Sequence, residues 1–150
     1  MLRHHRCGFF PGVNGLKGDE FNFLNTSDPA SAKVTVQDNS PYVGPFDPDH
    51  GTPATTDKIF TQKCLNAGGG KCATPTMGGF IEYAYLNRHK SVADASSLMN
   101  MFTPERLPVM SALAQEFALF DRFFASHPGP TWPNRLFQVQ LGTLSLSFYY

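Results

Sequence analysis

The spacing of apolar positions predicts a first helix near the middle of the chain. Phe60, Cys64 and Leu65 fall at helical spacing, so the helix is expected to begin near Thr56. The glycine run after Ala67 is expected to end it. A second helix is predicted next, over 77–87, with one apolar face; that face comprises Phe80, Ile81 and Ala84.

A third helix is marked by its own start signal as well as by its periodicity. Thr103 is a suitable N-cap, and Pro104 then occupies the first helical position. Pro108 interrupts the pattern, so the first turn is expected to be separate and the helix proper to restart there. Apolar residues follow at steps of three and four; these are Leu107, Met110, Ala114 and Phe117.

Strand patterns are short and few. Residues 33–36 alternate in the β-branched manner of a strand, whereas 41–50 is dense in turn formers and is expected to be irregular. Residues 118–125 consist of apolar runs around Asp121 and Arg122, which predicts a short strand buried on at least one face.

Length and composition narrow the class of protein. At 150 residues the chain is long enough for one domain, and its 13 glycines and 12 prolines favour a loop-rich α/β chain. Twelve Lys and Arg balance twelve Asp and Glu, which leaves no basic stripe to bind nucleic acid or anionic lipid. The expected partner is therefore a small substrate.

Cysteine spacing and the N-terminus add little about location. Cys64 and Cys72 flank a glycine-rich loop, and they are interpreted as two thiols, with a local disulfide as the alternative in an oxidising compartment. No apolar run is long enough to span a membrane, and residues 1–10 lack the apolar segment of a secretory signal. Localisation is left unassigned.

The residues with candidate chemistry surround Thr131. It follows a Pro-Gly-Pro loop and precedes a predicted helix, where unpaired backbone N–H groups and the helix dipole favour a phosphate. Asn134 adds a neutral donor and Arg135 a forked cation for phosphate oxygens. A threonine hydroxyl needs a base or a metal to become a nucleophile, and His127 is the nearest base. From chemistry alone, an inert N-cap and a surface arginine explain the same residues.

Three blocks together resemble the phosphoesterase family of non-specific phospholipases C and related acid phosphatases. The first is 12–22 and the second is Phe46-Asp47-Pro48-Asp49-His50. The third runs from Leu107 through the Phe-rich segment to Pro133-Asn134-Arg135-Leu136-Phe137. Residues 11–137 fit the resemblance.

The resemblance implies an activity, a fold and a metal. It implies a partial alkaline-phosphatase-like fold, α/β with three α/β/α layers and an incomplete sheet. Thr131 would be the catalytic nucleophile and a ligand of a divalent metal ion, and Asn134 and Arg135 would bind the substrate phosphate. The substrate would be a phospholipid or another phosphate ester, with a glycerophospholipid cleaved to diacylglycerol and a phosphorylated head group.

The chain also departs from the family pattern. We expect a divergent N-terminus over 1–11, a partial phosphoesterase domain over 12–137 and a divergent tail over 138–150. Residues 1–11 contain no Glu or Asn, although the family places a Glu-Asn metal segment there. A fragment from a partial or mis-spliced gene, without activity of its own, is therefore expected.

Two further sets of residues have two interpretations each. Asp47, Asp49 and His50 could join a metal site, but an ordinary turn is favoured. Four phenylalanines could line a lipid pocket, but core packing is favoured; they are Phe117, Phe120, Phe123 and Phe124.

Overall fold

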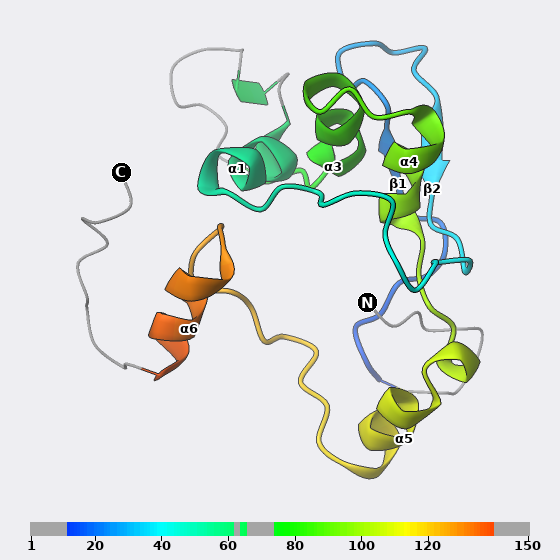
Figure 1. The fold of residues 1–150 in the computed structure, drawn as a ribbon, viewed down its shortest axis with the longest axis vertical. Helices are drawn as coiled ribbons and strands as arrows, with labels where there is room; N and C mark the ends of the chain where they lie inside the picture. The colour runs from blue at the N-terminus through cyan, green and yellow to red at the C-terminus, as the bar shows by residue number, and fades with distance from the viewer. Residues whose placement is uncertain (1–11, 62–63, 66–73, 140–150) are drawn as a thin grey trace.

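The computed structural model of the chain describes residues 12–61, 64–65 and 74–139. This part of the chain contains one two-stranded sheet and five α-helices, which confirms the expected α/β class at a coarse level (Figure 1). The sheet, α1, α3 and α4 lie together, whereas α5 and α6 lie apart from them and from one another.

The sheet pairs β1 (Phe21–Phe23) with β2 (Lys33–Thr35) in antiparallel register, with Asn22 opposite Val34. The strand predicted over 33–36 is therefore confirmed, because its β-branched residues suit a half-buried pleated surface. A single parallel bridge between Gln37 and Asn100 continues the pairing beyond β2.

Two helices form the middle of the fold, and both were predicted. α1 covers Thr52–Phe60, so it begins and ends earlier than predicted: Pro53 suits its first turn, and Thr61 leaves the helix with a φ of 66°. α3 (Gly79–Glu82) continues directly into a π-helix (Tyr83–Asn87), which together match the predicted 77–87 helix.

The core is small and centres on the second of these helices. Ile81 and Ala84 are buried as their spacing predicted, and they pack with Ala95 of α4 (Val92–Ser96). Ser91 caps α4 by accepting a hydrogen bond from the Asp94 backbone N–H. Partly buried side chains surround these residues; they are Leu24, Val34, Phe46, Tyr85, Leu98 and Met99.

The break predicted at Pro108 is confirmed. Pro104–Arg106 forms one 3₁₀ turn, and α5 then covers Pro108–Glu116. Thr103 precedes the turn without making a side-chain cap hydrogen bond. The apolar face of α5 does not pack into the core, because Met110 and Leu113 remain 57% and 48% exposed.

The strand predicted over 118–125 is wrong. These residues are irregular, with one turn at Asp121 and Arg122, and connect α5 to α6 (Thr131–Val139), and their side chains are exposed. An extended segment becomes a strand only when a neighbour pairs with its backbone, and no described residue pairs with this one. A hydrogen bond from the Asn14 backbone N–H to the Asp121 carboxylate connects this segment to the N-terminal part of the described chain.

The interpretation of the four phenylalanines as core residues is also wrong. Their exposed fractions are 71–79% in Phe117, Phe120, Phe123 and Phe124. Exposed apolar surface of this extent marks a site of interaction or of aggregation.

The structure also bears on the cysteines and on membrane-spanning helices. Cys64 is disulfide-bonded, which excludes the free-thiol interpretation for this residue, and Cys72 lies outside the described residues. Among the described helices, none is long and apolar enough to cross a membrane.

Candidate functional site

Thr131 is the first residue of α6 and its side chain is exposed. The helix start predicted from the Pro-rich loop is therefore confirmed, with Thr131 in the first turn rather than before it. Pro133 fits the same turn because its missing N–H would have no partner inside the helix. The hydroxyl thus lies at the positive end of a nine-residue helix.

An apolar pocket of about 500 Å³ lies beside Thr131. Arg135, one helical turn further along, lines the same pocket, as do Phe123 and Phe124 from the preceding segment. The Arg135 guanidinium lies 5.8 Å from the centre of the Trp132 ring, which orients it by a cation–π contact. A hydroxyl, a cation and aromatic rings therefore share one cavity.

Asn134 also lines this cavity, but its amide is engaged with the loop that precedes the helix. Its side-chain oxygen accepts a hydrogen bond of 2.9 Å from the His127 backbone N–H. Its amino group donates to the carbonyl oxygens of His127, Pro130 and Gly129 at 2.9, 3.1 and 3.4 Å. These contacts occupy the acceptor and both donors that an asparagine offers.

The same loop contacts the start of α1. Nε2 of His127 lies at hydrogen-bond distance, 3.0 Å, from Oγ1 of Thr52. A Cβ at Gly129 would lie 2.7 Å from the His127 ring and 2.8 Å from Oγ1 of Thr52, so only glycine fits this contact. His127, the one local base identified in the sequence, therefore binds Thr52.

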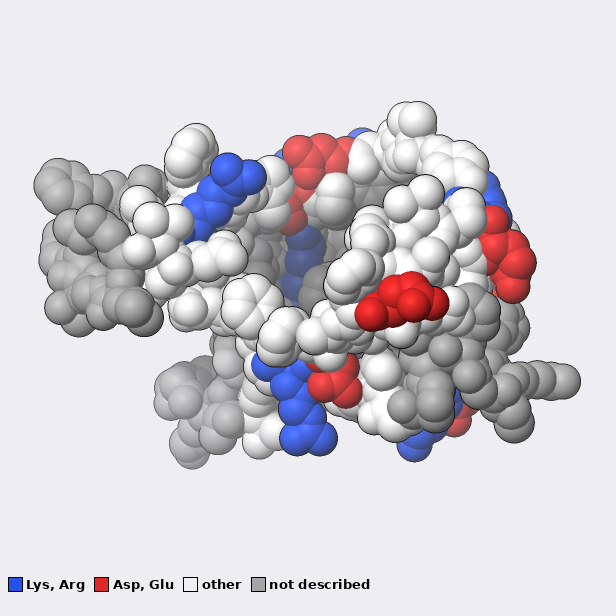
Figure 2. Space-filling model, turned by 90° about the horizontal axis from the view of Figure 1, so that it is seen from below, with Lys and Arg blue, Asp and Glu red and all other residues white. Residues whose placement is uncertain are grey.

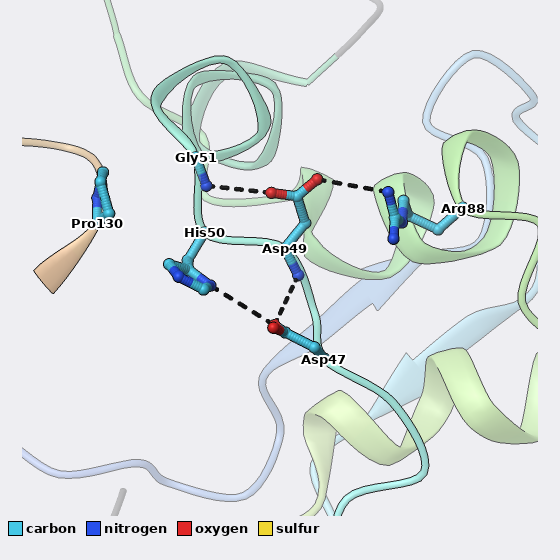
Figure 3. A pocket seen from close by; sticks show the side chains of 6 residues that line it. All are labelled: Asp47, Asp49, His50, Gly51, Arg88 and Pro130. Atoms are coloured by element: carbon cyan, nitrogen blue, oxygen red, sulfur yellow. Dashed lines mark hydrogen bonds and ion pairs between the residues drawn. The ribbon is translucent and has the colours of Figure 1, made fainter. Parts of the chain in front are cut away.

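A second, polar pocket of about 320 Å³ is lined in part by Pro130, the residue before Thr131 (Figure 3). Its remaining lining comes from the turn before α1 and from the end of the π-helix; these residues are Asp47, Asp49, His50, Gly51 and Arg88. Nδ1 of His50 lies 3.5 Å from the Asp47 carboxylate. The second sequence block and the nucleophile block thus meet in space.

Asp49 organises this turn. Its carboxylate accepts hydrogen bonds from the Gly51 backbone N–H at 3.1 Å and from the Tyr83 hydroxyl at 3.3 Å, and lies 3.7 Å from the Arg88 guanidinium. The Gly51 hydrogen bond is the main reason that the pKa of Asp49 lies below its usual value. The turn interpretation of Asp47-Pro48-Asp49-His50 therefore holds, and the turn also forms a pocket wall.

Lys58 supports the turn from behind. Its side chain is buried, and its ammonium donates to the backbone carbonyls of Pro48 and Asp49 and lies over the Tyr83 ring. Burial lowers the pKa of Lys58, and burial next to Asp49 raises the pKa of Tyr83. The cations of Lys58 and Arg88 thus both contact the turn.

The Asp49→Asn variant is expected to lose an acid-dependent part of the stability. Because the folded pKa lies below 3.8, the ionised carboxylate stabilises the fold above that pH, and the contribution disappears as the pH falls through the folded pKa. Asparagine also tolerates the φ of 52° at this position. Chemical denaturation across pH should therefore show the two free energies of unfolding converging in acid; a constant difference would contradict this.

The described residues do not form a metal site by themselves. No group of three or more His, Cys, Asp or Glu side chains in the described ranges is placed to hold an ion. Asp47 and Asp49 contact His50 and Arg88 instead. The donors present around Thr131 therefore do not fit the divalent metal that the resemblance implied, and we derive no chemical step through it.

The charged side chains on one face of the molecule are mixed in sign. Figure 2 shows one face on which basic and acidic side chains are interspersed, and neither sign forms a continuous patch. This distribution agrees with the balanced composition of the sequence.

The structure brings together what the sequence named separately. Thr131, Asn134 and Arg135 line one cavity, while Asp47 lines a second pocket together with Pro130 of the loop. Sequence reasoning missed Thr52 and Arg88, which are ordinary polar residues of a helix start and a helix end. No local pattern distinguishes them, because their role depends on a contact across the chain.

The sequence of the chain is similar to those of known proteins. Residues 5–143 match the model of the phosphoesterase family, and this range includes all of 12–137. Non-specific phospholipase C1 of Arabidopsis thaliana is 39% identical over 127 residues, covering 85% of this chain and 22% of the relative. Non-specific phospholipase C6 of the same plant is 37% identical over 127 residues, with the same shares.

A third relative extends the match slightly. Non-specific phospholipase C3 of Arabidopsis thaliana is 34% identical over 142 residues, covering 89% of this chain and 26% of the relative. The chain thus spans about a quarter of the length of the relatives it matches. The family model covers most of the chain, and the chain belongs to the phosphoesterase family.

Proposed function

We propose that the chain carries the nucleophile of a phosphoric-ester hydrolase of the phospholipase C type. The observation that carries the proposal is the position of Thr131, an exposed hydroxyl at the start of α6 that lines an apolar pocket together with Arg135. A glycerophospholipid likewise joins an apolar diacylglycerol to a charged phosphate. Relatives named non-specific phospholipases C support this substrate class.

The proposed reaction has two steps. The hydroxyl of Thr131 loses its proton as Oγ1 forms a bond to phosphorus, the bond from phosphorus to the glycerol oxygen breaks, and the glycerol oxygen takes up a proton as diacylglycerol leaves. Water then cleaves the ester between Thr131 and the head-group phosphate, which restores the hydroxyl and releases the phosphorylated head group. Arg135 and the N-terminal N–H groups of α6 would stabilise the negative phosphate oxygens.

The described structure fits part of a larger architecture. We propose that the two-stranded sheet and its helices belong to a three-layer α/β/α fold of the alkaline phosphatase type, as the resemblance implies. A divalent metal, which family membership suggests in general, would need most of its ligands from outside the described residues.

Two other functions compete with this one. An acid phosphatase of the same family would use the same hydroxyl on a phosphomonoester. A non-catalytic fragment would keep the fold without turnover, and the lack of a three-ligand metal set in the described ranges favours it.

A product-release assay separates the three. The purified chain is incubated with phosphatidylcholine vesicles or with para-nitrophenyl phosphate, with divalent cations added one at a time. A phospholipase C would release diacylglycerol and phosphocholine from the vesicles at a higher kcat/KM than nitrophenol from the monoester. Turnover of the monoester alone would support the phosphatase, and no turnover with either substrate would support the non-catalytic fragment.

A further inference from the structure

Asn134 holds the loop of 127–130 through both ends of its amide. The oxygen accepts from the His127 backbone N–H, and the amino group donates to the carbonyls of His127 and Pro130 at 2.9 and 3.1 Å. One side chain of α6 thus closes a ring around the four residues that precede Thr131. Only one orientation of the amide places its donors against carbonyls and its acceptor against an N–H.

The loop in turn places Thr131 against the rest of the site. The His127 ring meets Thr52, and Gly129 lies so close to both that a Cβ would clash with them. Gly51, the residue before Thr52, lines the polar pocket together with Pro130. Contacts within the protein therefore connect Asn134, through the loop, to the polar pocket, and no bound substrate is needed to form them.

We propose that Asn134 is a positioning residue, which fixes loop 127–130 and thereby sets Thr131 beside the apolar pocket, rather than a ligand of the substrate phosphate. The role of Thr131 in this statement rests on the proposed function, but the loop geometry does not. A direct phosphate ligand would need a free donor, whereas the two N–H groups of this amide are directed at backbone carbonyls.

Amide hydrogen exchange, followed by NMR on the intact chain without substrate, tests the inference. The Asn134→Ala variant removes the acceptor of the His127 N–H, so exchange at that amide should rise about tenfold, the scale of one lost hydrogen bond. Alanine favours a helix, so α6 itself should persist. The Thr131 resonances should shift, whereas those of Ile81 and Ala84 in the core should not.

Two further variants make the result specific. Asn134→Asp keeps an acceptor but places a carboxylate oxygen against the carbonyls of His127 and Pro130, so it should not restore the wild-type exchange rate at His127. Arg135→Ala, on the next residue of α6, should leave the His127 rate and the position of the loop unchanged. Wild-type exchange at His127 in Asn134→Ala, or a rise in Arg135→Ala as large as that in Asn134→Ala, would overturn the inference.

This measurement is independent of turnover. If the product-release assay finds no activity while Asn134→Ala loosens the loop, the positioning role stands and the proposed function fails. If activity is present and the loop is unchanged in Asn134→Ala, the opposite conclusion follows.

Discussion

The Thr131→Val variant is expected to lose hydrolysis of phosphatidylcholine by about a thousandfold or more, because removal of a nucleophile eliminates the covalent route. Valine has nearly the shape of threonine, and the side chain is exposed at the first residue of α6. The substitution therefore removes the hydroxyl and leaves the helix and both pockets in place. Release of phosphocholine, measured over time at saturating substrate, gives the ratio of rates.

The Thr131→Ser variant is the matched control, since it keeps a hydroxyl at the same position. It should retain turnover and form the same covalent intermediate, with the head-group phosphate esterified to the side-chain oxygen. Mass spectrometry of the acid-quenched protein should find this adduct on the peptide containing residue 131 in the wild type and in Thr131→Ser. Equal turnover by wild type and Thr131→Val would exclude the hydroxyl as nucleophile.

The Gly79→Ala variant is expected to lose several kcal/mol of stability, on the scale of a backbone clash in the core, enough to unfold a small domain. Gly79 begins α3 where this helix crosses α1. A Cβ there would lie 2.9 Å from the Lys58 carbonyl oxygen, and still closer to the Asp57 carbonyl. Both atoms belong to helical backbone, so neither helix can yield without moving the other.

Gly78→Ala is the control, one residue earlier in the chain. A Cβ at that position would meet Thr61 Cγ2 at 3.4 Å and Thr76 Oγ1 at 3.5 Å, which are ordinary contacts with side chains. Its φ of −93° suits any residue. Thermal unfolding followed by circular dichroism should show a folded Gly78→Ala variant and an unfolded or strongly destabilised Gly79→Ala variant. Similar transitions in both would refute the close-approach argument.

Local sequence determined the elements whose signals lie within a few residues. The break at Pro108, the helix start at Thr131 and the buried face of Ile81 and Ala84 all follow from backbone restriction or from helical spacing. These predictions hold because proline geometry and periodicity act on neighbours in the chain. The first helix begins and ends earlier in the structure than predicted, because helix propensity alone does not locate its end at Thr61.

Residue types and family motifs identify the candidate site residues in the sequence, but not their hydrogen-bond partners. Thr131, Asn134 and Arg135 were singled out together, and they lie around one cavity. Yet the sequence could not separate a donor free for phosphate from one committed to the backbone. Asn134 acquires its contacts from a loop folded back onto α6, so its partners depend on the path of the chain.

Tertiary structure alone decided two features of the site. The segment 118–125 has the apolar composition of a buried strand, but a strand also requires a paired neighbour, and the described chain provides none. The contact of His127 with Thr52 joins residues 75 positions apart. By itself the sequence determined the family, the local elements and the hydroxyl at the helix start; long-range contacts determined which surfaces surround that hydroxyl.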